Sequence, residues 1–140
     1  MATEYKKPLP PINLTNKPFW DGAKRHELMA YKCLNCGRYY WPAVHCLACD
    51  KPDMTWVRVS GRGEVYTFTV MHQLYHPAWE GELPYNICWV KLDEGPIIMA
   101  NVTGCKNDDI YIGMHVVAIF DDVTGEVTLP RFRPSDEKRP

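Results

Sequence analysis

The chain has 140 residues, enough for one full domain or a small module beside a compact one, and its 46% hydrophobic content is that of a globular protein. A formal net charge of −1 argues against nucleic-acid or anionic-membrane binding, because such partners are held by a strong positive field. The sequence has no apolar run of about 18 residues, and residues 1–14 lack the apolar core of a signal peptide. We therefore expect a cytoplasmic protein that does not span a membrane.

Residues 1–32 are expected to form an extended arm followed by a helix. Prolines favour an extended arm because proline fixes φ and lacks an N–H. The helix is expected to begin near Pro18 and to run directly into Cys33. Its apolar face must cover either the chain's own barrel or a partner chain. The residues expected on this face are Phe19, Trp20, Ala23, Leu28 and Tyr31.

Residues 33–54 contain the strongest motif, two Cys-x-x-Cys pairs made by Cys33, Cys36, Cys46 and Cys49. Four thiolates at this spacing form a tetrahedral cage for a metal ion, and tandem pairs in a chain without a signal peptide favour metal over disulfides. Zinc and a rubredoxin-type iron both suit four thiolates, and the lack of a redox-partner motif favours zinc. Four protein ligands leave no open position for a substrate, so the expected role of the metal is structural.

The residues around the cysteines fit a zinc ribbon. Gly37 and Asp50 follow the two pairs, where each turn needs a left-handed residue, and Asp is among the few residues besides Gly that tolerate this conformation. Residues 38–42 are expected to form one arm of a β-hairpin. His45 adjoins Cys46 and is an alternative ligand.

Residues 55–134 predict an OB-fold barrel of five antiparallel strands, which makes the chain mainly β. The first strand is expected to be long, joining residues 56–60 to residues 64–72 through glycines that let it turn a corner. The other expected strands are residues 87–92, 97–102, 115–120 and 126–132, and residues 135–140 are a tail.

The loop at residues 72–85 is long for a barrel connection, and long loops in compact domains often carry function. Tyr75, Trp79 and Tyr85 are of the type enriched at protein interfaces. His72 and His76 are candidate acid–base groups or metal ligands, although packed or solvated loop histidines are the more common case.

Two further functions remain open from the residues alone. Tyr66 and Phe68 on a barrel strand are candidates for stacking single-stranded bases, which the net charge disfavours. Cys105, in a turn, and His72 are candidates for a stand-alone hydrolase or transferase, although no base can be paired with that thiol from the sequence. Cys88 lies within a strand and is expected in the core.

In combination these pieces resemble the acyl-CoA-associated family that joins a rubredoxin-like zinc ribbon to an OB-fold. The matching pieces run from about residue 18 to residue 134, and Asp50 departs from the glycine that many ribbons carry. They are Pro18-Phe19-Trp20, Cys33-x-x-Cys36-Gly37, Trp41-Pro42, Cys46-x-x-Cys49, Pro84-Tyr85, Gly104-Cys105 and residues 60–70, 92–95, 112–114 and 129–134.

The resemblance implies a partner subunit of a thiolase, a lipid-transfer-type aldolase or a hydratase that carries no catalytic residue itself. It implies a hetero-oligomer with a thiolase-like catalytic subunit, structural Zn²⁺ on the four cysteines and a CoA ester at or near the interface. Within the family it points to the small subunit of a benzoylsuccinyl-CoA-type thiolase. The candidate contacts with the partner or the CoA ester are Phe19, Trp20, Tyr75, His76, Trp79, Arg131 and Arg133.

Overall fold

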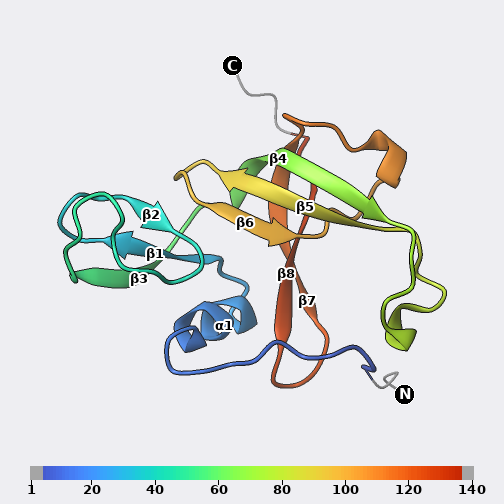
Figure 1. Ribbon diagram of the computed structural model, residues 1–140, viewed down its shortest axis with the longest axis horizontal. Helices are drawn as coiled ribbons and strands as arrows, with labels where there is room; N and C mark the ends of the chain where they lie inside the picture. Colours follow the sequence, from blue (N-terminus) through green and yellow to red (C-terminus); the bar gives the residue numbers. More distant parts are fainter. Residues whose placement is uncertain (1–4, 137–140) are drawn as a thin grey trace.

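The computed structural model describes residues 5–136 and arranges them as a small ribbon, an α-helix and a curled β-sheet (Figure 1), with two short 3-10 helices, η1 (Pro77–Trp79) and η2 (Asn107–Asp109), in the loops. The ribbon sheet has the order β2-β1-β3, and the barrel sheet has the order β6-β5-β4-β7-β8. The strands are β1 (Met29–Cys33), β2 (Tyr39–Tyr40), β3 (Met54–Arg58), β4 (Arg62–Met71), β5 (Tyr85–Leu92), β6 (Ile97–Ala100), β7 (His115–Asp122) and β8 (Thr128–Pro134). The expected fold class, mainly β with an N-terminal helix, a zinc ribbon and an OB-fold barrel, is confirmed.

Helix α1 (Lys17–Lys24) is shorter than the sequence pattern predicts. It ends where His26 takes a left-handed φ of 60° and the N–H of Glu27 donates to the Gly22 carbonyl at 2.8 Å. Leu28 therefore lies after the helix, and Tyr31 lies in β1. The expectation that the helix runs into Cys33 is wrong, because the chain turns at His26 and reaches Cys33 as a strand.

Strand β3 belongs to the ribbon and not to the barrel. It pairs with β1 from Met29↔Arg58 to Cys33↔Met54. The expected continuous first strand of the barrel is therefore wrong, since the chain leaves the ribbon sheet after Arg58 and enters the barrel sheet at Arg62. Gly61 allows this change of direction with a φ of +77°, and its carbonyl accepts from the Ala118 N–H at 2.7 Å.

The barrel sheet curls until its two outer strands meet. A parallel bridge joins Val102 to Phe132, and the Thr103 N–H donates to the Phe132 carbonyl at 2.8 Å. β4 is the long central strand and has a bulge between Val65 and Thr67. The strands expected at residues 87–92, 97–102, 115–120 and 126–132 overlap β5, β6, β7 and β8.

One continuous core joins the helix, the ribbon and the barrel. It contains Phe19 from α1, Ala30 from β1 and the fully buried Val65, Cys88 and Phe132 from the barrel. The prediction that Cys88 is a core residue is confirmed. Because apolar side chains of all three parts share this core, the ribbon packs on the barrel and is not a separately packed domain.

No helix within residues 5–136 is long and apolar enough to cross a membrane; α1 has 8 residues. The arm expected at residues 1–16 and the tail expected at residues 135–140 each include four residues that lie outside the described part of the chain.

Candidate metal centre and partner surface

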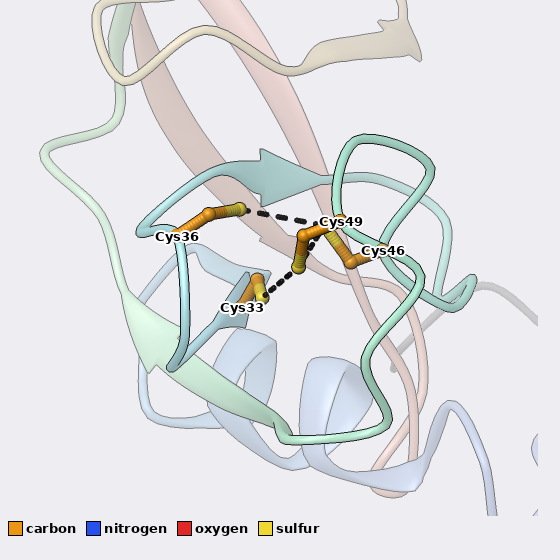
Figure 2. Close-up of side chains that lie close together, drawn as sticks. All are labelled: Cys33, Cys36, Cys46 and Cys49. Atoms are coloured by element: carbon orange, nitrogen blue, oxygen red, sulfur yellow. Dashed lines mark hydrogen bonds between the residues drawn. The ribbon is translucent and has the colours of Figure 1, made fainter.

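The four cysteines converge from two turns on one point (Figure 2). Their sulfur atoms all lie within 4.8 Å of one another. The measured sulfur–sulfur distances are 3.6 Å for Cys33 and Cys49, 3.4 Å for Cys36 and Cys46, and 3.5 Å for Cys46 and Cys49. In a tetrahedral site with Zn–S bonds of about 2.3 Å the sulfurs lie about 3.8 Å apart. The residues therefore fit a structural zinc ion, as expected from the sequence.

The two turns are built alike. Gly37 has a φ of 79° and donates its N–H to the Cys33 carbonyl at 2.9 Å, and Asp50 has a φ of 55° and donates to the Cys46 carbonyl at 2.9 Å. The prediction of a left-handed residue after each cysteine pair is confirmed. His45 is exposed, with its Nε2 atom 3.4 Å from the Asp50 carboxylate, and it is not among the clustered ligands.

The surroundings of the cage shift the pKa values of its thiols in opposite directions. The backbone N–H of Cys36 is the main cause that lowers the pKa of Cys33, and the Tyr40 hydroxyl is the main cause that lowers the pKa of Cys46 to about 5. The backbone N–H of Arg38 lowers the pKa of Cys36, but the neighbouring sulfurs raise it overall to about 11. Four thiolates this close need a cation between them, which a zinc ion supplies.

Tyr40 is a residue whose role the sequence did not reveal. Its hydroxyl lies 3.4 Å from the Cys46 sulfur and accepts a hydrogen bond from the Leu47 N–H at 3.1 Å. It therefore orients a metal ligand from outside the cage, as groups that hydrogen-bond to metal ligands commonly do.

We expect Tyr40→Phe to weaken zinc binding by roughly tenfold, because outer-shell partners of metal ligands typically change affinity by 10- to 100-fold. Competition with a chromophoric chelator measures the affinity directly. Tyr39→Phe is the matched control, since Tyr39 lies on the same short strand and its ring faces the Lys32 ammonium at 5.2 Å. Equal zinc affinity in the two variants would show that the Tyr40 hydroxyl does not act on Cys46.

The long loop at residues 72–85 folds around a short helix, η1 (Pro77–Trp79). His76 caps this helix, accepting from the Ala78 N–H through Nδ1 at 3.1 Å, and its ring contacts Trp79 edge-on at 5.6 Å. Trp79 also packs near Tyr85, with ring centroids 6.1 Å apart. Tyr75 remains 69% exposed. The loop is thus an ordered unit with one large aromatic side chain free to contact another molecule.

The N-terminal arm reaches this loop, which the sequence did not predict. The Lys7 ammonium lies 2.7 Å from the Glu82 carboxylate and 5.7 Å from the centre of the Trp79 ring. Near the other end of the arm, the Trp56 indole donates to the Thr15 carbonyl at 3.2 Å. The arm therefore connects the ribbon to the loop along the barrel (Figure 1).

Two neighbouring hollows are lined by four of the candidate contact residues, Phe19, Trp20, Trp79 and Arg131, whereas Tyr75, His76 and Arg133 line neither. A pocket of about 300 Å³ is lined by Trp79, Lys7, Cys105 and Arg131, among others. A smaller hollow of about 180 Å³ is lined by Phe19, Trp20 and Trp41 together with apolar side chains of β6 and β8. Asn101 and Arg131 lie on both, so the arm, loop and helix face one continuous surface.

Arg131 and Arg133 differ in how far they are engaged. The Arg131 guanidinium donates to Asp121 at 3.1 Å and to the Asn101 side chain at 2.7 Å. Arg133 is exposed and donates to the Pro134 carbonyl at 3.2 Å. Arg131 is therefore held against the pocket wall, whereas Arg133 keeps a free guanidinium face.

A buried amide supports the pocket floor. Asn86 accepts from the Val102 N–H and donates to the Val102 carbonyl, both at 2.8 Å, and also donates to the Asn107 side chain at 3.0 Å. The Asn101 side chain donates in turn to the Asn86 carbonyl. Asn86 thus completes the backbone hydrogen bonding where β6 ends. An asparagine within an apolar strand is the signal that would have identified it.

The residues considered for catalysis or base stacking do not form a site within residues 5–136. Burial raises the pKa of the Cys105 thiol, which opposes nucleophilic activation, and no acid–base side chain hydrogen-bonds to it there. His72 is exposed. Tyr66 is exposed on β4, while Phe68 packs against the core.

The cage, the ribbon sheet and the curled barrel sheet define a zinc-ribbon protein with an appended OB-fold. Family models agree: residues 20–55 match the ChsH2 rubredoxin-like zinc ribbon domain, and residues 56–121 match the ChsH2 C-terminal OB-fold domain. The chain therefore belongs to the ChsH2 or DUF35 family, as the sequence resemblance implies.

The relatives include scaffold proteins and subunits of hydratases. A "DUF35 domain-containing scaffold protein" of Methanocaldococcus jannaschii is 37% identical over 69% of this chain and 70% of its own length. A "Probable enoyl-CoA hydratase alpha subunit" of Thermomonospora curvata is 36% identical over 92% of this chain. The chain spans only 40% of that hydratase subunit.

Solved structures show the same fold. A chain of the "Ltp2-ChsH2(DUF35) aldolase" superposes with a TM-score of 0.80 at 36% identity, covering 90% of this chain and 98% of that one. A DUF35 protein of Sulfolobus solfataricus superposes with a TM-score of 0.59 at 17% identity, which shows the fold alone.

Proposed function

We propose that this chain is a non-catalytic, zinc-containing subunit of an acyl-CoA thiolase-type complex. The observation that carries the subunit role is the match to nearly the whole length of a chain of the "Ltp2-ChsH2(DUF35) aldolase". The choice of a thiolase as the partner rests on the family resemblance of the sequence. Within the described residues, no acid–base side chain hydrogen-bonds to the Cys105 thiol, which lines the larger pocket. The zinc stabilises the ribbon, and the catalytic groups belong to the partner.

The partner surface in this proposal is the face that carries the two hollows. Phe19, Trp20 and Trp79 line it. Tyr75 and His76 project from the same loop as Trp79, and Tyr75 has the size and exposure of an interface anchor.

The CoA ester is proposed to lie at the edge of this face, where cationic groups gather. Lys7 and Arg131 line the larger pocket, and Arg133 follows on β8. Phosphate groups are bound by such side chains. Because Arg131 is already held by Asp121 and Asn101, Arg133 is the more available of the two arginines.

Co-purification with a thiolase-like protein encoded beside this chain tests the proposal. The expected result is a stable hetero-oligomer in which thiolysis requires both chains and the purified small chain alone is inactive. Separate elution, with thiolysis independent of this chain, would contradict it. Assembly with a hydratase or aldolase chain in place of the thiolase would keep the subunit role and overturn the thiolase assignment.

Tyr75→Ala should weaken this assembly without unfolding the chain, because the side chain is largely exposed in isolation. Loss of an aromatic anchor costs about 2 kcal/mol, roughly thirtyfold in the dissociation constant. Tyr111→Ala is the matched control, since Tyr111 is 61% exposed but lies in the connection before β7. An unchanged affinity for Tyr75→Ala would exclude this side chain from the interface.

A further inference from the structure

One stretch of the barrel sheet has a free side. β4 pairs with β5 along its whole length, from Gly63↔Leu92 to Met71↔Tyr85, but it pairs with β7 only from Arg62 to Glu64. Hydrogen bonds between Val65 and residues Gly113 and Met114 extend this second side by one residue. Among the described residues, no backbone partner beyond β5 is found for residues 66–71. Every second residue there directs its N–H and C=O groups to the open side.

The other edges of the sheet are partly covered. β6 and β8 meet at the isolated Val102–Phe132 bridge, which lies just beyond the end of β6. β7 diverges from β4 after Val117, and there the linker after α1 protects it, since His26 stacks on Phe120 at 5.3 Å and contacts the Asp122 carboxylate at 3.1 Å. Within residues 5–136, the open side of β4 (residues 66–71) is a longer unpaired stretch than the outer side of β6 (Ile97–Ala100).

The open segment lacks the features that keep an edge strand from pairing. Natural edges carry lysine, proline or inward-pointing charges to prevent association. Residues 66–71 read Tyr-Thr-Phe-Thr-Val-Met, with no charge, proline or glycine, and are rich in residues that favour strands. A bulge is present, but it lies at the start of the segment. Such an edge is expected to be paired in the working protein.

The sequence of the segment identifies what pairs with it. Thr67-Phe68-Thr69 reads the same in both directions, so an antiparallel pair of two such strands centred on Phe68 sets each Thr67 opposite a Thr69. Thr–Thr pairs stabilise antiparallel sheets, and no like charges face each other. Both threonine side chains are exposed. We propose that a second copy of this chain docks on β4 through residues 66–70, joining two barrel sheets about a two-fold axis at Phe68.

This interface differs from the proposed catalytic-partner surface, which involves α1 and the 72–85 loop. A two-fold axis through β4 gives an isologous interface, the commonest kind in homodimers. The pairing between the two β4 strands cannot extend to Val65, because the backbone of Val65 already hydrogen-bonds to Gly113 and Met114.

Sedimentation velocity of the zinc-loaded full chain, without any partner, tests the proposal. The expected species has twice the mass of one chain. Thr67→Lys/Thr69→Lys places like charges opposite each other and should raise the dimer dissociation constant by roughly tenfold or more. Met99→Lys is the matched control, an exposed residue on β6, and should leave the dimer intact.

A monomeric wild-type chain, or a dimer that the double substitution leaves unchanged, would overturn the proposal. Hydrogen exchange decides the matter if the double variant does not fold. Amides of residues 66–70 in the wild-type chain should become more protected as its concentration rises. Protection that does not depend on concentration, or that requires the catalytic partner, would also overturn it.

Discussion

Cys36→Ser is expected to remove zinc from the protein and to unfold the ribbon sheet. Cys36 lies in the first turn, and its sulfur is 3.4 Å from that of Cys46. A structural zinc ion contributes roughly 10–16 kcal/mol of apparent binding free energy, which in a module this small is largely folding free energy. Elemental analysis should find less than one zinc ion per chain, and amides of β1, β2 and β3 should exchange rapidly with solvent.

Cys105→Ser is the control for this experiment, since Cys105 lines the large pocket and lies outside the cage. It should retain full zinc content and a protected ribbon. Full zinc occupancy in Cys36→Ser would remove the four-cysteine site. A strong chelator should reproduce the effect of Cys36→Ser on the wild-type chain, because both act through the loss of the same ion.

Asn86→Ala should destabilise the barrel by roughly 2–6 kcal/mol, because two buried backbone groups lose their partners and each costs about 1–3 kcal/mol. Asn86 is 7% exposed, and both the N–H and the C=O of Val102 bond to its side chain. The midpoint of urea unfolding measures the loss, and fast exchange of the Val102 amide would locate it.

Asn107→Ala is the matched control for Asn86. The Asn107 side chain donates to the Pro84 carbonyl at 3.1 Å and is only half-buried, so water can replace much of what it loses. Its effect should be clearly smaller. Equal destabilisation by the two substitutions would mean that the Val102 groups find other partners.

The metal cage was predictable from the sequence because its chemistry is local. Two Cys-x-x-Cys pairs, each followed by a residue that tolerates a positive φ, specify both turns and all four ligands. The barrel strands were predictable for a similar reason, since β-branched and aromatic residues alternate between turn signals. In both cases the information lies within a few neighbouring residues.

The errors concern contacts between distant segments. Leu28 and Tyr31 fit a helical period, and nothing nearby shows that His26 would take the left-handed conformation that ends the helix. Residues 56–58 have the composition of any strand, and only pairing with β1 assigns them to the ribbon. The contact of Lys7 with Glu82 spans 75 positions and has no sequence signature.

The strand β3 also limits how this protein can be divided or recombined. The two family models meet between residues 55 and 56, which is inside β3 (Met54–Arg58). A chimera joined at that point would pair β1 of one parent with a strand drawn partly from the other. The Val59 N–H donates to the Leu28 carbonyl at 2.9 Å, so the ribbon's hydrogen bonds continue past β3. A chimera joined between Ser60 and Gly61 would keep the complete ribbon sheet of one parent. Exchange of ribbons among relatives is therefore expected to succeed at that position.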